Sequence, residues 1–309
     1  MDKTFDVAII GSGPAGLTAG VYTVRGAAST ILFAGEKWGG QLMLTTLVEN
    51  YPGFPDGIQG PDLMAAMRKQ AENLGVKTVN QNVTGFNFSN SPFELTASDG
   101  NKYLAKSVIV ATGAETRWLD IPGEKELIGR GISSCAPCDA PFFKDKAVAV
   151  IGGGDSAMEE ALVLSKFAKK VTIIHRRKEF RASEIMQQKV KTDPKISIIW
   201  NKQVIKALGT NKLEKIILED IDTKAKEDFI LDGMFVAVGH IPACIQFEGI
   251  LDLDEKGYLK RMPKDGFITS TSVKGIFTAG DVHDEHYKQA VTAAGFGCMA
   301  ALDALKYLE

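Results

Sequence analysis

Two copies of a glycine-rich turn pattern, each between an apolar run and a helix pattern, constrain the fold of this 309-residue chain. The first copy spans residues 11–16, after the apolar run 5–10, and a helix pattern follows it over 17–25. Such a turn is typical of the Rossmann βαβ unit, whose glycines let the backbone approach a pyrophosphate at the helix N-terminus. The residues of this first turn are Gly11, Ser12, Gly13, Pro14, Ala15 and Gly16.

The second copy repeats the same arrangement. Residues 146–151 form an apolar strand pattern and residues 158–167 a helix pattern, on either side of the turn. The turn contains Gly152, Gly154, Asp155, Ser156 and Ala157, and alanine is permitted at the last position of this fingerprint. We therefore predict an α/β fold with two Rossmann-like dinucleotide-binding domains.

Between the two copies, the chain shows a hairpin signal. Asp99-Gly100 separates two strand patterns over 91–96 and 102–106, as in a tight β-hairpin. Residues 107–110 form a further apolar run, which we expect to be a separate buried strand. A helix is expected over 61–74.

The order of the patterns predicts that one domain is inserted into the other. Strand and helix patterns resume over 275–281 and 289–308, after the second copy has ended. We place the first domain in residues 1–114 and 245–309, and the inserted domain in residues 115–244. Two connecting segments of this kind form a natural hinge.

A cysteine pair, Cys135 and Cys138, lies just ahead of the second copy, and Asp139 follows it directly. Cysteines at this spacing can cycle between a dithiol and a disulfide, and the carboxyl group can move protons for them. A zinc site needs about four ligands, but the chain has no second CxxC and its histidines form no finger pattern. An inert structural disulfide is disfavoured because the chain looks cytosolic. Cys244 and Cys298 are isolated and are expected to be inert thiols.

The two turns differ in the charge of the residues near the end of the next strand. Glu36 follows the first such strand, near the position of an acid that binds ribose hydroxyls, with a solvated loop glutamate as the alternative. His175, Arg176 and Arg177 end the second strand, and Arg181 lies further on. Guanidinium groups pair with a 2′-phosphate that a carboxylate would repel. The second site is therefore predicted to bind NADPH, and the first a different nucleotide, FAD.

Composition argues against several other classes of function. The net charge of -2 at pH 7 gives no global basic field for nucleic acid or an anionic membrane. We expect no apolar run to reach the roughly 20 residues of a membrane span. The first residues run almost at once into a strand pattern and lack the apolar core of a signal peptide. We therefore expect a cytoplasmic protein without a metal, a membrane or a nucleic-acid partner.

The ordered set of these motifs resembles the low-molecular-weight, bacterial-type thioredoxin reductases of the pyridine nucleotide-disulfide oxidoreductase family, over nearly the whole chain. Several further short motifs make the resemblance specific. They are Gly39-Gly40-Gln41-Leu42, residues 49–55, Ala111-Thr112-Gly113, Phe180-Arg181, Gly280-Asp281-Val282, Gln289-Ala290 and Ala294-Gly295. The chain departs from the family at Ala140-Pro141, where glycine is usual, and at Lys288, where arginine is common.

The resemblance implies a flavoenzyme whose first domain holds FAD and whose inserted domain holds NADPH and the redox disulfide. Cys138 would face the flavin, Cys135 would attack the protein substrate, and Asp139 would be the acid–base residue. The residues implied at the FAD site are Gly11, Ser12, Gly13, Pro14, Ala15, Gly16, Glu36, Gly40, Gln41, Leu42, Asn50, Ala111, Thr112, Gly113, Gly280, Asp281, Gln289 and Ala290. Those implied at the NADPH site are Gly152, Gly154, Asp155, Ser156, Ala157, His175, Arg176, Arg177 and Arg181.

The expected function is NADPH-dependent reduction of the disulfide of thioredoxin by a homodimeric enzyme, with rotation of the inserted domain between half-reactions. Arg130 and Phe142 flank the disulfide segment and are expected either to contact thioredoxin or to pack within their loops. Related flavoproteins leave open a small-dithiol oxidase, a reductase that feeds a peroxidase partner and a ferredoxin-linked enzyme. The alternative from a different class is a non-catalytic nucleotide-binding scaffold.

Overall fold

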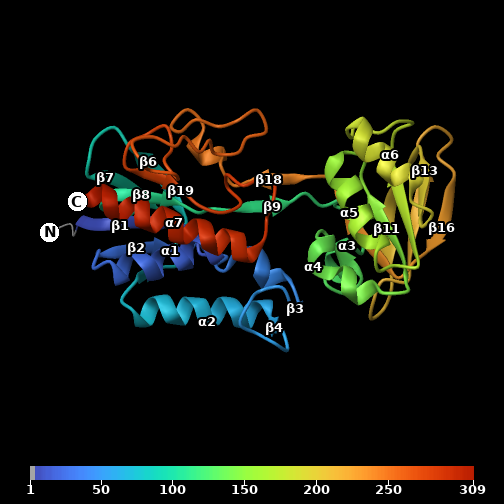
Figure 1. Ribbon diagram of the computed structural model, residues 1–309, viewed down its shortest axis with the longest axis horizontal. Helices are drawn as coiled ribbons and strands as arrows, with labels where there is room; N and C mark the ends of the chain where they lie inside the picture. Colours follow the sequence, from blue (N-terminus) through green and yellow to red (C-terminus); the bar gives the residue numbers. More distant parts are fainter. Residues whose placement is uncertain (1–3) are drawn as a thin grey trace. The chain divides into compact units, whose positions relative to one another are not determined.

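The computed structural model describes residues 4–309 and divides into two compact units (Figure 1). Unit 1 comprises the described part of Met1–Glu115 together with Ile241–Glu309, and unit 2 is Thr116–His240. The two boundaries therefore lie between Glu115 and Thr116 and between His240 and Ile241, one residue after and four residues before those expected. Cys244 belongs to unit 1 because it is buried in the same core as Phe247, and its thiol donates to the backbone oxygen of Val282 at 3.5 Å.

A seven-stranded sheet forms the centre of unit 1. Its strands run in the order β5-β2-β1-β8-β7-β6, and β19 pairs with β8. The pairings among β5, β2, β1, β8 and β19 are parallel, as in a Rossmann domain, whereas β7 and β6 add an antiparallel edge. The bounds are β1 Thr4–Ile10, β2 Thr30–Phe33, β5 Lys77–Val79, β6 Val83–Asn87, β7 Phe93–Ala97, β8 Lys102–Val110 and β19 Ile276–Thr278.

β8 corrects the expectation of two separate strands over 102–106 and 107–110. The strand is continuous over nine residues. Its first half pairs antiparallel with β7, which confirms the hairpin at Asp99-Gly100, and its second half pairs parallel with β19. The second half is buried because it lies between β1 and β19, and this explains its apolar sequence.

Three long helices belong to unit 1: α1 (Pro14–Arg25), α2 (Gly60–Asn73) and α7 (Ala290–Leu308). α1 and α7 lie side by side (Figure 1). They approach closely because a Cβ at Gly297 of α7 would overlap the backbone oxygen of Ala15. The shorter elements of unit 1 are η1 Gly40–Leu44, β3 Leu47–Val48, β4 Ile58–Gln59 and η3 Ile245–Phe247.

The apolar character of α7 differs from the expectation that no apolar run reaches the length of a membrane span. By length and composition alone, this helix is long and apolar enough to cross a membrane. Ala300, Ala301 and Ala304 are fully buried in the core that α7 shares with α1 and the sheet. The buried residues of α7 lie on one face of the helix, whereas Val291, Met299 and Leu302 are exposed, so only part of its apolar surface is covered within unit 1.

Unit 2 contains a second parallel sheet, in the order β10-β17-β11-β12-β13, and a three-stranded antiparallel sheet, β14-β15-β16. The parallel strands are β10 Ile132–Ser133, β11 Ala147–Ile151, β12 Lys170–His175, β13 Ile196–Trp200 and β17 Gly233–Val236. The antiparallel strands are β14 Lys202–Leu208, β15 Lys215–Asp220 and β16 Lys226–Ile230. The helices are α3 Glu124–Leu127, α4 Ala136–Asp139, η2 Ala140–Phe143, α5 Asp155–Ser165 and α6 Glu184–Thr192. The two-domain Rossmann-like α/β fold predicted from the turn patterns is therefore confirmed.

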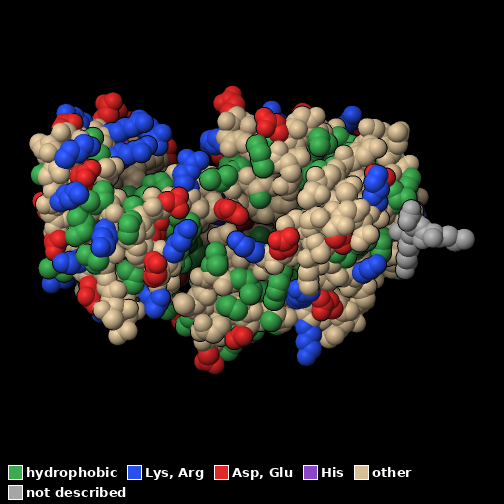
Figure 2. Space-filling view, turned by 180° about the vertical axis from the view of Figure 1, so that it is seen from behind, with side chains coloured by type: hydrophobic (Ala, Val, Ile, Leu, Met, Phe, Trp, Pro, Cys, Tyr) green, Lys and Arg blue, Asp and Glu red, His purple; other side chains and the backbone are tan. Residues whose placement is uncertain are grey.

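Two short strands connect the units and pair with each other: β9 (Ala114–Thr116) and β18 (His240–Pro242). On the face seen in Figure 2, acidic, basic and apolar side chains are interspersed over much of the surface of each unit. This mixture agrees with the net charge of -2.

Candidate cofactor and redox sites

The first glycine turn can accept no side chain at two of its positions. Gly11 has φ +115°, and a Cβ there would overlap the backbone oxygen of Ala111, the residue that follows β8. A Cβ at Gly16 would overlap the backbone oxygen of Gly11, so the third glycine lets α1 pack against the turn. Gly13 has open space around it and precedes α1 without a side-chain cap, which leaves room at the helix N-terminus for a phosphate.

Ser12 has a structural task within the same turn. Its buried hydroxyl donates to the backbone oxygen of Ala34 at 2.8 Å and accepts from the backbone nitrogen of Gly39 at 2.9 Å. The side chain therefore fastens both ends of the loop that follows β2. Glu36 lies in this loop with an exposed side chain, as a residue that meets ribose hydroxyls would.

Residues far apart in the sequence meet beside the N-terminus of α7. Gln289 caps the helix, and Ala290 is its first residue. The side-chain nitrogen of Asn50 donates to the side-chain oxygen of Gln289 at 3.3 Å, across 239 positions of sequence. Gly40, Gln41 and Leu42 form the first part of η1, and Gly40 and Gln41 are exposed.

The two remaining predicted segments of this site follow neighbouring parallel strands. Ala111, Thr112 and Gly113 follow β8, and Gly280 and Asp281 follow β19, which pairs with β8. Ligands of open α/β sheets bind at this carboxyl edge.

Asp281 has a buried carboxylate oxygen, Oδ1, without a hydrogen-bond partner among the described residues. Burial, reinforced by the nearby Asp284 carboxyl, raises the pKa of Asp281 to about 7. Buried polar atoms in native proteins are nearly always hydrogen-bonded, so an unpaired acceptor here fits a ligand that brings its own hydroxyl donor. The donor set and the glycine turn therefore fit a dinucleotide with a polyol or ribose.

Removal of the Asp281 charge is expected to flatten the pH dependence of stability. The folded carboxyl keeps its proton to a pH of about 7, whereas the unfolded carboxyl releases it near 3.8, so the wild-type free energy of unfolding falls as the pH rises between these values. For the nucleotide-free protein, Asp281→Asn should add about 2–4 kcal/mol at pH 8 and little at pH 4. Denaturant unfolding at both pH values measures this difference. Glu248→Gln, which changes an exposed carboxyl, is the control, and parallel profiles for the two variants would contradict the expectation.

The second glycine turn also excludes a side chain at two of its positions. A Cβ at Gly152 would overlap the backbone oxygen of Ala237, and one at Gly153 would overlap the imidazole ring of His175. That ring is buried and packs against Phe180 and Trp200, and burial lowers the pKa of His175. His175 therefore supports the turn from within unit 2 as a neutral packing residue.

Arg176, Arg177 and Arg181 are exposed at the end of β12 and in the loop after it. The guanidinium groups of these three arginines make no hydrogen bond or ion pair with any of the described residues. The backbone nitrogen of Arg181 donates to the backbone oxygen of Gly153 at 2.7 Å, which joins the arginine loop to the glycine turn. Asp155 accepts from the backbone and hydroxyl of Ser183 at 2.9 and 2.7 Å, so it orients the loop rather than pairing with the arginines.

Cys135 and Cys138 form a disulfide, with an S–S distance of 2.10 Å and a Cα–Cα distance of 5.3 Å. The pair lies at α4, where the backbone nitrogen of Cys135 donates to the hydroxyl of Ser133 at 3.1 Å. Burial raises the pKa of Asp139, while a hydrogen bond from Ser133 opposes the shift. A raised pKa suits a carboxyl group that carries a proton to or from a thiolate.

Two residues that support the disulfide segment are not evident from the sequence. Glu160 of α5 accepts from the backbone nitrogen of Ala136, and Ser133 bonds Cys135 as described. Glu160 lies 24 positions from its partner, and no motif marks it. Only the position of Glu160 on the inner face of α5, the helix that follows the second glycine turn, could have indicated its role.

The departures at Ala140-Pro141 and Lys288 are accommodated locally. Ala140 is fully buried and has φ -52°, so this position needs no glycine. Lys288 has φ +49°, and its ammonium group donates to the backbone oxygen of Glu285 at 2.6 Å. Phe142 is exposed, whereas the Arg130 guanidinium donates to the backbone oxygen of Glu126.

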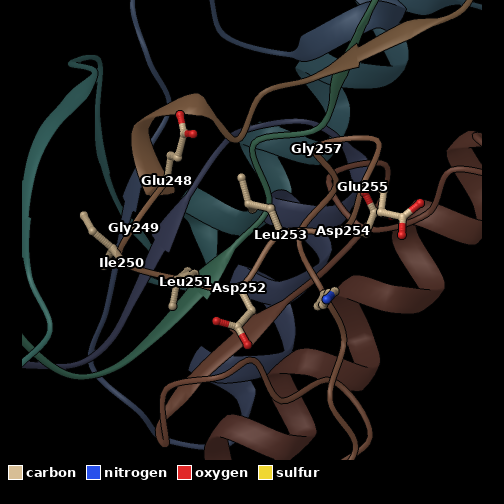
Figure 3. A pocket seen from close by; sticks show the side chains of 10 residues that line it. Glu248, Gly249, Ile250, Leu251, Asp252, Leu253, Asp254, Glu255 and Gly257 are labelled. Atoms are coloured by element: carbon tan, nitrogen blue, oxygen red, sulfur yellow. The ribbon is translucent and has the colours of Figure 1, made fainter.

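A separate hollow in unit 1 is lined by residues between Glu248 and Lys260, and none of the predicted site residues lies in it. Figure 3 shows the carboxylates of Glu248, Asp252 and Glu255 directed to different sides of this hollow. Over residues 4–309, no group of three or more histidine, cysteine, aspartate or glutamate side chains is placed to hold a metal ion.

Comparison with known proteins agrees with this architecture. The family model for pyridine nucleotide-disulphide oxidoreductases matches residues 5–297. A thioredoxin reductase of Streptomyces clavuligerus is 50% identical over 309 residues, covering 100% of this chain and 95% of the relative. One from Rickettsia felis is 47% identical over 312 residues and covers both chains fully. The solved structure of a thioredoxin reductase from Giardia duodenalis has a TM-score of 0.93 and 40% identity, covering 99% of each chain.

The chain therefore belongs to the pyridine nucleotide-disulphide oxidoreductase family and, within it, to the thioredoxin reductases. It is an oxidoreductase, and membership of this family implies a flavin and a nicotinamide nucleotide as cofactors.

Proposed function

We propose that this protein is an NADPH-dependent reductase of thioredoxin that carries FAD in unit 1. The observation that carries the proposal is the Cys135–Cys138 disulfide in the same unit as the arginine-flanked glycine turn. A unit that combines a nucleotide turn with a redox disulfide has the parts needed to pass electrons from a nucleotide to a protein disulfide.

The proposed binding residues for the two cofactors are supported by the glycine turns and by the groups that lie beside them. The first glycine turn and Asp281 would hold the pyrophosphate and a hydroxyl of FAD, and Glu36 the adenosine ribose. Arg176, Arg177 and Arg181 would hold the 2′-phosphate of NADPH, because these exposed guanidinium groups have no acidic partner among the described residues. When bound, FAD would accept a hydride from NADPH and pass two electrons to the disulfide.

The reduced cysteine pair would then act on thioredoxin by thiol–disulfide exchange. The Cys135 thiolate attacks the thioredoxin disulfide, which forms a mixed disulfide and releases one thioredoxin thiolate. The Cys138 thiolate attacks the Cys135 sulfur, which restores Cys135–Cys138 and releases the second thioredoxin thiolate. Two electrons pass to thioredoxin, and Asp139 supplies or takes protons as thiols and thiolates interconvert.

We also propose that unit 2 rotates between the two half-reactions. Only β9 and β18 connect the units, and a pair of strands can act as a hinge for a rigid body. A cytoplasmic homodimer is proposed on the resemblance to the low-molecular-weight thioredoxin reductases.

Anaerobic titration of the purified protein with NADPH, followed by addition of oxidised thioredoxin, tests donor, flavin and acceptor together. We expect the flavin absorbance to bleach with NADPH and to return when thioredoxin is added. Protein that takes up no FAD would support the scaffold alternative. Bleaching by a dithiol rather than by NADPH, with rapid oxygen consumption, would support the dithiol oxidase.

A further inference from the structure

The loop after β2, residues 35–39, is held at both ends by hydrogen bonds within unit 1. At its start, the backbone nitrogen of Gly35 donates to the backbone oxygen of Gln81 at 3.2 Å, and that of Glu36 donates to the Asn82 side chain at 3.4 Å. At its end, Gly39 is bonded to the buried hydroxyl of Ser12. Gly35 and Gly39 have φ +76° and +90°, so the loop uses conformations that favour glycine.

Trp38 lies between these anchors, and Arg68 of α2 covers its ring. The guanidinium carbon of Arg68 lies 4.8 Å from the centroid of Trp38, within the range of a cation–π interaction. The indole is half-buried against the core that contains α1, α2 and the sheet. The Arg68 contact therefore fastens the middle of the loop to α2.

Arg68 is itself fixed by two further partners. Its Nε lies 2.8 Å from a carboxylate oxygen of Glu72, and its Nη2 donates to the side-chain oxygen of Asn80 at 3.0 Å. Asn80 and Asn82 belong to the same turn between β5 and β6, and Asn82 holds the backbone of Glu36. One arginine thus joins α2, the β5–β6 turn and the loop that carries Glu36.

We propose that Arg68, stacked on Trp38, is a positioning residue for the adenosine half of FAD. The proposal rests on the proposed function, because it takes Glu36 as the residue that meets the adenosine ribose. A glycine-rich loop loses conformational freedom when it orders around a ligand, and this loss weakens binding. Arg68 holds the loop in place beforehand and so strengthens binding without touching the nucleotide itself.

The test is the FAD affinity of the apoprotein, measured by the quenching of flavin fluorescence. Arg68→Gln keeps a polar side chain but removes the charged, planar guanidinium group that stacks on Trp38. We expect it to raise the Kd for FAD about fivefold, as the loss of a cation–π contact implies. Lys69→Gln is the matched control on the next, exposed residue of α2, and it should change the Kd by less than about twofold.

Two further measurements separate positioning from general stability. Because FMN lacks the adenosine half, Arg68→Gln should leave the Kd for FMN within about twofold of wild type. Trp38→Leu should weaken FAD binding to a similar extent, and Trp38→Leu/Arg68→Gln should be no weaker than the worse single variant, because both act through one contact.

Several outcomes would overturn the proposal. They are an unchanged Kd for FAD in Arg68→Gln, an equal loss for FAD and FMN, or losses that multiply in the double variant. A wild-type apoprotein that does not bind FAD at all would instead refute the proposed function. These results are therefore distinguishable.

Discussion

In the Cys135→Ser variant, NADPH is expected to bleach the flavin as it does in the wild-type protein. The rate of thioredoxin reduction is expected to fall below the wild-type rate by a factor on the order of a thousand or more. Binding of the two nucleotides is not expected to need the Cys135 sulfur, so hydride transfer from NADPH to the flavin should persist. Exchange with thioredoxin needs a thiolate that can form the mixed disulfide, and serine cannot replace it at neutral pH. Anaerobic absorbance changes and a coupled thioredoxin assay measure the two steps separately.

Cys298→Ser is the matched control, because Cys298 is a half-buried free thiol in unit 1 and has no part in the proposed relay. It should keep both steps near wild-type rates. Substantial thioredoxin turnover by Cys135→Ser would falsify the dithiol relay, whatever the behaviour of the flavin.

Arg176→Gln/Arg177→Gln is expected to raise the KM for NADPH about a hundredfold and to change the KM for NADH little. Each charge-assisted hydrogen bond to the 2′-phosphate contributes roughly 1.5–3 kcal/mol, and solvent exposure favours the lower figure. NADH lacks this phosphate, so it loses no contact. Steady-state kinetics with both nucleotides measure the switch in preference.

Lys178→Gln provides the control for this pair of substitutions. Lys178 is a neighbouring cation whose ammonium group already lies 3.0 Å from the carboxylate of Asp222. Its loss should alter the NADPH preference by less than about threefold. An equal effect of Lys178→Gln would mean that general positive charge, rather than the two arginines, selects the nucleotide.

Local geometry explains which parts of the site could be predicted. Gly11 and Gly152 occupy positions where a Cβ would overlap other atoms, so glycine is required there and the turns can be recognised in the sequence. The strands that precede them, β1 and β11, are largely buried and apolar, and this also leaves a clear pattern in the sequence. The pairing of Cys135 with Cys138 follows from their spacing and was expected as the redox centre.

The parts that could not be predicted depend on contacts across long stretches of sequence. The bond between Asn50 and Gln289 spans 239 positions, and only the resemblance placed both near a flavin. The unpaired oxygen of Asp281 is a property of its burial, which no local pattern records. Helix α6 was not expected because it is largely polar and buries only Val190. The Arg68–Trp38 contact likewise needs the packing of α2 beside the loop.

Unit 1 is built from two segments of the chain that are separated by unit 2, and this arrangement sets an order for folding during synthesis. Unit 2 is one continuous segment, Thr116–His240, and can complete its fold as soon as that segment is available. Unit 1 needs β19 beside β8 and α7 against α1, and both come from the segment after residue 240. Until then, the β8 edge and the apolar face of α1 lack their partners and are exposed to misassembly. The proposed flavin site therefore forms last, since Gly280, Asp281 and Gln289, which are proposed to line it, all come from this final segment.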